Sequence, residues 1–507
     1  MPPRSTGCAT CRERKIRCDE TRPQCTRCQV YGVVCGGYRT DEPGGTEFRN
    51  VSLATAQKAQ SQYDRRRDES GALASSSSTS DGGPEQIDPT SRIEPPNATL
   101  RDGEFNRTVF WKEFLDNHVP KECDLQCDQH CFFRTCMGLS TTQPALLHGL
   151  DALSLVQIGS VNNDKRLLDQ ANQKYAEALR DLHRALSQQE LLRDDHVLAA
   201  VMVMKAWKFY SEIASSRGVG WGEHIRGVQN ILTARGPASF QSELALELYV
   251  NARNGALCHS LLIRKAPAFA HPSWRRVAER TGQRDQSSAL NGLAIQVPGI
   301  LERYDALDLD MTQIDDVLAD AALIERDLRS WMSRWESQHE TRPIGEFANF
   351  TSLCSDPTFD IAHMFPNFVV ASLHSTYWIC MYFIRITIRA LHTARAIVGR
   401  GYIEHPDQIV REEEILGYIL NMCHCIPYFC EPASASTGTV SIFLPLRTAA
   451  LYFVEHSMWS RATWIGNVRR TVMNKGLAPP SIDDMDIRDC RDLIGTRVDQ
   501  VTCFLRK

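Results

Sequence analysis

The sequence lacks a long uninterrupted apolar run. Its most apolar stretch, residues 368–388, is broken by His374, Ser375, Thr376 and Arg385. Charge near the centre of a span is costly in lipid, so this pattern favours a buried core helix over a transmembrane helix. Residues 1–7 also lack the apolar segment that a signal peptide needs. We therefore expect no membrane partner and a reducing compartment, where cysteines stay free of disulfides.

Sequence motifs of common enzyme classes are missing as well. The chain has no P-loop, no His-Glu-x-x-His motif and no nucleophile elbow. The glycine-rich segment 218–222 follows no predicted strand, so we interpret it as a loop that leads into a helix. These absences predict that the chain is not an enzyme.

Positive charge is concentrated near the N-terminus. The 507 residues carry a net charge of −4, which by itself favours no particular partner. Residues 1–40 hold eight Lys or Arg and three acids, a net charge of +5. A basic head on an acidic body is typical of a protein that binds nucleic acid through one end.

Cysteine is clustered in the same basic head. Six of the 18 cysteines form two Cys-x2-Cys pairs, each followed by a cysteine seven positions later: Cys8, Cys11, Cys18, Cys25, Cys28 and Cys35. One tetrahedral zinc takes four ligands. Six thiolates complete two such sites if two of them bridge both metals, whereas a mononuclear four-cysteine site would leave two thiols spare. A disulfide-linked module is the other alternative, and a reducing compartment disfavours it.

Residues 7–28 resemble the fungal binuclear zinc-cluster transcription factors. All six ligand positions match, as do the basic run between the second and third cysteines and Pro23 in the loop between the two halves. The resemblance implies two Zn²⁺ ions, with Cys8 and Cys25 bridging them. One ion would then take Cys8, Cys11, Cys18 and Cys25, and the other Cys25, Cys28, Cys35 and Cys8.

The basic run is the candidate DNA-reading element. Arginine and lysine suit the O6 and N7 acceptors of guanine in the major groove. The resemblance implies that Lys15, with Arg14 beside it, contacts the bases of a CGG-type triplet. The candidates for phosphate contacts, which position the protein without reading sequence, are Arg12, Arg17, Arg22 and Arg27. A solvated surface or a localisation signal is the alternative interpretation of such a run.

The chain divides by composition into three parts. We expect a zinc-cluster DNA-binding domain over residues 1–40, a flexible linker over 41–100 and an all-helical domain over 101–507. The linker is poor in large apolar groups and includes four consecutive serines at 75–78. Residues 41–70 lack heptad spacing, so no coiled coil is predicted there. A homodimer formed through the helical body and a monomer both remain open.

The body shows helical periodicity and little strand-like alternation. One predicted helix face is Leu168, Ala171, Tyr175, Leu179, Leu182 and Leu186. Asp194 and Asp195 lie in capping positions before a helix over 197–210, and Gly236 follows a helix that carries Trp221, Ile225, Val228 and Leu232. Further helices are expected at 241–265, 314–336, 366–398, 408–426 and 442–459. Segments 221–236, 426–429 and 443–446 resemble the fungal-specific transcription factor domain, which implies a regulatory role.

Less regular groups of cysteine and histidine elsewhere in the chain could also have specific functions. A second Cys/His group is a candidate metal or redox site, although its spacing favours ordinary core or loop residues: His118, Cys123, Cys127, His130, Cys131 and Cys136. Core packing is expected for Cys423, His424, Cys425 and Cys430. For His224 we expect an ordinary structural role within its helix.

Two charged segments also allow functional interpretations. Arg65–67 are a candidate nuclear-import signal. Residues 481–489 mix acids with apolar groups, as an activation segment or a capped amphipathic helix would.

Together these features predict a nuclear, sequence-specific regulator of genes transcribed by RNA polymerase II. Its expected partners are double-stranded DNA and the transcription machinery, and the family likeness suggests control of a metabolic or secondary-metabolite gene cluster. The alternative is a helical metabolite-binding, redox-sensing or enzymatic protein whose zinc head only localises it to DNA.

Overall fold

The computed structural model describes two compact units, which divide at residues 94 and 95. The described residues are 8–14, 18–19, 24–30, 32–35, 103–121, 128–139, 143–188, 193–211, 219–308, 310–338, 344–353, 358–399, 409–475 and 477. The predicted linker, Arg65–67 and the acidic segment 481–489 lie outside these ranges. Within the first unit, the described helices are α1 (Ala9–Glu13) and α2 (Thr26–Val30).

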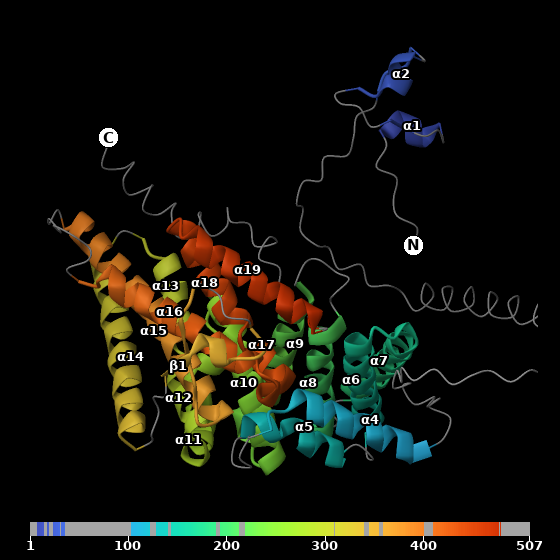
Figure 1. The fold of residues 1–507 in the computed structure, drawn as a ribbon, viewed down its shortest axis with the longest axis horizontal. Coiled ribbons are helices and arrows are strands. Elements are labelled where there is room, and N and C mark those ends of the chain that lie inside the picture. Colours follow the sequence, from blue (N-terminus) through green and yellow to red (C-terminus); the bar gives the residue numbers. More distant parts are fainter. Residues whose placement is uncertain are drawn as a thin grey trace, which may run out of the picture. The chain divides into compact units, whose positions relative to one another are not determined.

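The second unit is helical, as the sequence predicts (Figure 1). Its longer helices are α4 (Gly103–His118), α5 (Asp128–Leu139), α6 (Pro144–Asn162), α7 (Lys165–Leu186), α8 (Asp195–Ser211), α9 (Val219–Arg235), α10 (Glu243–Ile263), α11 (Arg275–Arg284), α12 (Gln286–Ala294), α13 (Val297–Asp305), α14 (Met311–Gln338), α15 (Phe368–Val398), α16 (Glu412–Cys430), α17 (Ala435–Ser441), α18 (Phe443–Glu455) and α19 (Trp459–Asn474). A short antiparallel pair, β1 (Ile344–Glu346) and β2 (Ile361–His363), places Gly345 opposite Ala362.

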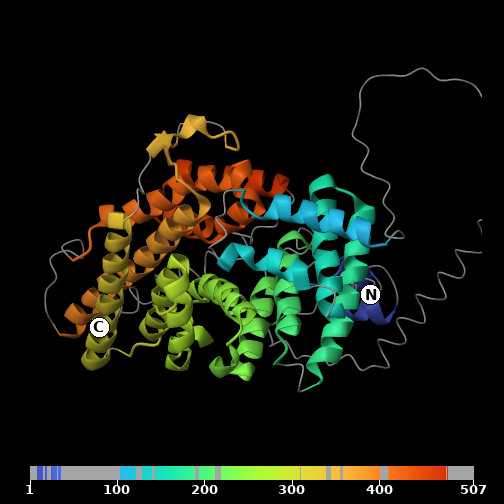
Figure 2. The same ribbon diagram turned by 90° about the horizontal axis from the view of Figure 1, so that it is seen from below.

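One continuous apolar core runs through this helical unit. Helices α6 and α7 lie towards one end and α14 and α15 towards the other, in both views (Figures 1 and 2). The beginning of the unit meets its last third, because the backbone N–H of Lys121 donates to the carbonyl of Ala433 at 3.0 Å. The Thr437 hydroxyl likewise donates to the carbonyl of His118. Residues far apart in the sequence thus close the unit into a single body.

Several predicted helix boundaries are confirmed. Asp194 caps α8, since its carboxylate accepts the backbone N–H of His196 at 2.8 Å. Helix α9 ends at Arg235, and Gly236 follows with a φ of 74°, a value that glycine adopts without strain. The apolar stretch 368–388 lies within α15 and supplies many of its buried side chains.

The predicted apolar face of α7 is partly wrong. Leu179 is 45% exposed, and the fully packed positions are Ala171, Ala178 and Ala185 at intervals of seven residues. Small residues let two helices approach closely. On the facing helix α6, a Cβ added to Gly159 would lie 3.1 Å from the side chain of Leu168. Gly159 therefore lets α6 approach Leu167 and Leu168 at the start of α7 closely.

Two other expectations need correction. Residues 219–222 form the first turn of α9, where a loop was expected. Helix α16 continues through Pro427 to Cys430, although the pattern predicts an end at residue 426. A proline removes one backbone donor, and here the packed neighbours of α16 hold the helix on both sides of it, since Ile426 and Phe429 are buried in the core.

In the described part of the chain, no single helix combines the length and apolar character needed to cross a membrane. Residues 432–441 and 443–455 meet that test only as a pair, with a bend of 57° between them.

Candidate metal centre and nucleic-acid interface

The two short helices of the head repeat one local design. Helix α1 starts directly after Cys8 and helix α2 directly after Cys25. The backbone N–H of Cys11 donates to the Cys8 sulfur at 3.4 Å, and the N–H of Cys28 donates to the Cys25 sulfur at the same distance. Each Cys-x2-Cys pair thus wraps one helical turn around a sulfur. These N–H donors stabilise negative charge on that sulfur.

The six cysteine side chains converge on one point of the head. The Cys8 Sγ lies 3.6 Å from that of Cys25 and 3.8 Å from that of Cys28. The Cys11 Sγ lies 3.7 Å from Cys25 Sγ and 4.0 Å from Cys28 Sγ. Two groups of four have all their sulfurs within 4.8 Å of one another: Cys8, Cys11, Cys18 and Cys25, and Cys8, Cys25, Cys28 and Cys35. Cys8 and Cys25 belong to both groups.

The donor set fits zinc. A tetrahedral Zn²⁺ with Zn–S bonds of about 2.3 Å holds its sulfurs about 3.8 Å apart, which is close to the separations in the head. All six thiols are free of disulfides. Burial raises the pKa of Cys8 to about 12 and also raises the pKa values of Cys11 and Cys25. A bound dication reverses this preference by stabilising the thiolates directly, so the cluster suits a metal far better than it suits six neutral thiols.

Two polar contacts that the sequence analysis missed hold the halves of the head together. The Asp19 carboxylate accepts the backbone N–H groups of Thr26 at 3.0 Å and Arg27 at 3.3 Å, at the start of α2. The Thr10 hydroxyl donates to the carbonyl of Val34 at 2.9 Å. An acid directly after Cys18 was the available signal, but its partner lies seven residues away and only the fold identifies it.

The structure describes part of the basic surface. Arg14 is exposed just past the end of α1, and Arg27 is exposed on α2. Arg12 lies in α1, but its side chain is outside the described residues, as are Lys15, Arg17 and Arg22. The assignment of base and phosphate contacts therefore stays a prediction.

Comparison with known proteins agrees with this geometry. Residues 6–43 match the family model for the fungal Zn(2)-Cys(6) binuclear cluster domain, and residues 114–350 match that for the fungal specific transcription factor domain. The chain belongs to the fungal binuclear zinc-cluster transcription factors. The cluster domain of this family binds two zinc ions.

Individual relatives match over limited regions. An uncharacterised protein of Emericella nidulans is 24% identical over 30% of this chain and 34% of its own length. The aspercryptin biosynthesis cluster-specific transcription regulator of the same species is 59% identical over 6% of this chain and 5% of its own. Arginine metabolism regulation protein II of Saccharomyces cerevisiae is 54% identical over 6% of this chain and 4% of its own length. The chain thus spans about a third or less of these relatives. No solved structure matches it.

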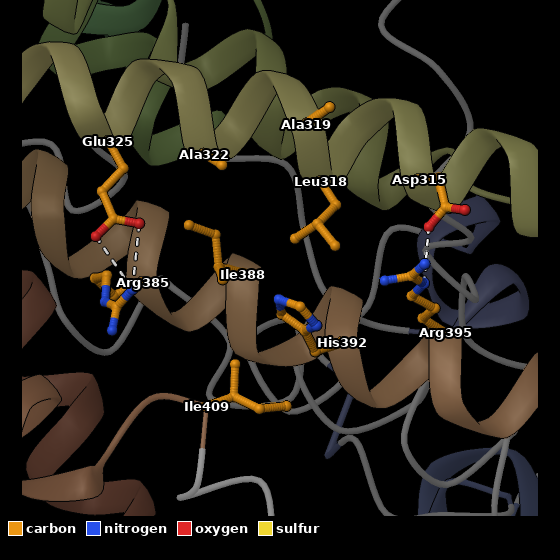
Figure 3. Close-up of a pocket in the computed structure, with 10 residues that line it drawn as sticks. All are labelled: Asp315, Leu318, Ala319, Ala322, Glu325, Arg385, Ile388, His392, Arg395 and Ile409. Atoms are coloured by element: carbon orange, nitrogen blue, oxygen red, sulfur yellow. Dashed lines mark hydrogen bonds and ion pairs between the residues drawn. The ribbon is translucent and has the colours of Figure 1, made fainter. Parts of the chain in front are cut away.

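The helical unit holds a pocket of about 510 Å³ between α14 and α15 (Figure 3). An ion pair closes each end: Asp315 with Arg395 at 2.9 Å, and Glu325 with Arg385 at 3.1 Å. Between these pairs the lining is mainly apolar, and Ala322 leaves space opposite Ile388.

The chemistry of this pocket favours an uncharged ligand. Its two arginines are already paired with carboxylates, so an anion would gain little from them. Burial and the nearby Arg395 lower the pKa of His392, which also lines the pocket. A neutral imidazole can hydrogen-bond to a hydroxyl or carbonyl group. The pocket is therefore suited to a largely apolar molecule that carries such a group.

The weaker Cys/His patterns are mainly parts of the core. Cys423, Cys425 and Cys430 are buried, as expected for core packing. His118 is buried, with its Nδ1 2.6 Å from the Tyr210 hydroxyl, and Cys136 is buried too. Of the remaining members of that second Cys/His group, Cys123 and Cys127 lie outside the described residues, and the side chains of His130 and Cys131 are not described.

Proposed function

We propose that this protein is a sequence-specific DNA-binding regulator of transcription by RNA polymerase II, which acts in the nucleus. The observation that carries the proposal is the pair of four-sulfur groups that share Cys8 and Cys25. In this proposal Cys8, Cys11, Cys18, Cys25, Cys28 and Cys35 are the zinc ligands, with Cys8 and Cys25 as bridges. In the same proposal, residues 1–40 bind DNA and residues 41–100 link this domain to the helical body. Residues 101–507 form that body, which has a regulatory role and no enzymatic activity.

The proposed reading head presents its cations outside the metal core. Arg14 and Arg27 are exposed, which suits contact with DNA. Lys15 follows Arg14 directly and would reach the guanines of a CGG-type triplet in the major groove. Arg12, Arg17, Arg22 and Arg27 would contact phosphates, which supply affinity and register on all sequences alike.

The target genes belong to a metabolic or secondary-metabolite cluster in this proposal. Support comes from a relative whose head is 59% identical and whose name describes a cluster-specific regulator. A second supporting relative is the pestheic acid cluster transcriptional regulator 3 of Pestalotiopsis fici, 53% identical over 32 residues. Double-stranded DNA and the transcription machinery are the proposed partners, and the protein acts as a monomer or as a homodimer.

A pair of substitutions tests base reading against phosphate binding. Lys15→Ala should abolish most of the preference for a CGG-containing duplex over a random duplex, a loss of about 1–3 kcal/mol. Arg22→Ala should weaken binding to both duplexes by a similar factor and reduce the salt dependence of binding. Equal losses on both duplexes for Lys15→Ala would contradict the assignment of base reading to this residue.

The pocket between α14 and α15 favours a second candidate function, which is sensing of an apolar metabolite by the body. Neutral aromatic alcohols are suitable probes, because they match the apolar lining and His392. A bound probe should raise the melting temperature of the full chain, and the filling variant Ala322→Leu should abolish that rise. A rise that persists in Ala322→Leu would place the ligand elsewhere.

A further inference from the structure

Helix α19 carries positive charge without a matching carboxylate. Residues 456–482 contain no Asp or Glu, but they contain Arg461, Arg469, Arg470 and Lys475. Within the described ranges, no carboxylate lies within ion-pairing distance of these four cations. Elsewhere in the body such pairs are common: on α15, Arg385 pairs with Glu325 at 3.1 Å and Arg389 with Glu412 at 2.5 Å.

Hydrogen bonds to uncharged acceptors take the place of ion pairs on α19 and at Lys475 just after it. The Arg470 guanidinium donates to Asn467 Oδ1 at 3.2 Å, and the Lys475 ammonium donates to the carbonyl of Cys430 at 2.5 Å. Arg461 donates to the sulfur of Met458 at 3.4 Å. The Nε of Arg469 is buried and has no hydrogen-bond partner among the described residues. These cations therefore keep the capacity to bind acidic groups.

The outer face of α19 also exposes apolar side chains. The helix packs on the body through Trp464, Ile465 and Val468, and it lies along one edge of the body in Figure 1. Away from that contact, Trp459 is 63% exposed and Met473 is 49% exposed. Together with Arg470, they make a mixed basic and apolar surface, which we call the α19 face.

The chain itself supplies a complementary segment directly after this helix. Residues 481–489 contain four aspartates, one arginine and three apolar residues: Ile482, Met485 and Ile487. Their net charge of −3 opposes the four cations described above, three on α19 and Lys475 just after it. Acidic and apolar groups are interspersed in this segment, as cations and apolar groups are on the α19 face.

The connection is short enough to favour this segment over an external partner. Leu477 is buried and fixes the chain just past α19. The six residues from there to Asp483 span at most about 20 Å when extended, and α19 is about 24 Å long. Residues 481–489 can therefore fold back along the second half of α19. A short tether of this kind holds a segment at an effective concentration of about millimolar.

We propose that residues 481–489 dock on the α19 face, with their aspartates against Arg469 and Arg470 and their apolar residues towards Met473. This contact is independent of DNA reading by the head. If the segment also recruits the transcription machinery, a step that rests on the proposed function, its exposure is controlled by its release from α19.

Hydrogen–deuterium exchange of the full-length chain tests the contact. The helix variant Arg469→Gln with Arg470→Gln should speed exchange in residues 481–489 by about tenfold, as expected for the loss of two or three partly exposed ion pairs. Raising the salt concentration to about 0.5 M should have the same effect in the wild type, because salt screens such pairs. The matched control is Arg275→Gln with Arg276→Gln, an exposed arginine pair on α11, which should leave exchange in the segment unchanged.

A tail variant removes any ambiguity from misfolding of α19. Replacing Asp483, Asp484 and Asp486 with Asn leaves α19 intact and should speed exchange in the tail and along the exposed half of the helix. Exchange of residues 481–489 at the rate of an unprotected peptide in the wild type would overturn the proposal. Unchanged exchange in both variants would also overturn it. Weaker DNA binding by the helix variant, with tail exchange unchanged, would assign α19 to DNA phosphates instead.

Discussion

Cys8 and Cys25 lie with their sulfurs 3.6 Å apart, and each belongs to both four-sulfur groups of the head. The other four cysteines each belong to a single group. Because zinc takes four ligands, only a shared pair lets six thiolates complete two sites. Shared and unshared cysteines should therefore respond differently to substitution.

Zinc content should report that difference. Wild-type protein should hold two zinc ions per chain. Cys35→Ser should lose about one ion, since it removes a ligand from one group, whereas Cys25→Ser should lose both, since it removes a ligand from each. Elemental analysis of the purified chains measures this, and Cys258→Ser in the body is the control that should keep two. Equal zinc content in Cys25→Ser and Cys35→Ser would contradict the bridging arrangement.

Asp19 should stabilise the head through its contact with α2. Asp19→Ala removes the acceptor for the backbone N–H groups of Thr26 and Arg27, a loss of about 1 kcal/mol for such a cap. Zinc release into a competing chelator should become correspondingly easier. Asp19→Asn keeps only one of the two acceptor oxygens and should retain part of the stability. If Asp19→Ala and Asp19→Asn release zinc equally easily, the negative charge of Asp19 matters more than its hydrogen bonds to α2.

Close packing around Gly438 should make it intolerant of a side chain. A Cβ at this position in α17 would lie 2.4 Å from the carbonyl oxygen of Phe429 and 2.5 Å from the Ser434 Cβ. Gly438→Ala should lower the free energy of unfolding by about 1–3 kcal/mol, the usual cost of overpacking. The control is Gly417→Ala in α16, which meets no atom within 4 Å and should be neutral or slightly stabilising. Chemical denaturation of the full chain compares them, and equal stability would argue against tight packing at α17.

Lys205 should destabilise the body less at alkaline pH than at neutral pH. It is 7% exposed, donates to Asn251 Oδ1 at 2.9 Å, and has its pKa lowered by burial from 10.5 to about 8. Between pH 8 and 10.5 this amine binds more protons in the unfolded chain than in the folded one, so the contribution of Lys205 to stability rises with pH in that window. Buried thiols and phenols such as those of Cys380 and Tyr382, whose pKa values are raised, contribute in the opposite direction. Below pH 8 the buried charge of Lys205 is a constant cost.

Replacement of this lysine tests its effect directly. Lys205→Met should raise the free energy of unfolding at pH 7 by about 1–3 kcal/mol, and this gain over the wild type should shrink between pH 8 and 10. Lys265→Met is the control, because Lys265 is largely exposed and should change stability by less than about 0.5 kcal/mol. An unchanged pH profile in Lys205→Met would show that this amine is solvated.

The head could be predicted from sequence because ligand spacing encodes a metal site locally. Cys8 to Cys35 are separated by short fixed intervals, and thiolate chemistry leaves few alternatives. The contact from Asp19 to the start of α2 could not be predicted, since it depends on how the two halves fold against each other. The side chain of Lys15 lies outside the described residues, so its role still rests on the resemblance.

The positions of the helices in the body could be predicted from sequence, but the way in which they pack together could be predicted less well. Periodic apolar residues identified α9, α10, α14 and α15. Ala171 was predicted as part of the buried face of α7, but the buried Ala178 and Ala185 were missed, because alanine carries a weak hydrophobic signal. The pocket between α14 and α15 depends on the pairing of two helices, since Ala322 leaves space only where Ile388 faces it.

Selection of bound sequences from random DNA by the full-length, zinc-loaded chain tests the central proposal most directly. The account predicts enrichment of a CGG-type triplet, and loss of all enrichment after zinc is chelated. Failure to enrich any sequence, or enrichment that persists without zinc, would contradict it.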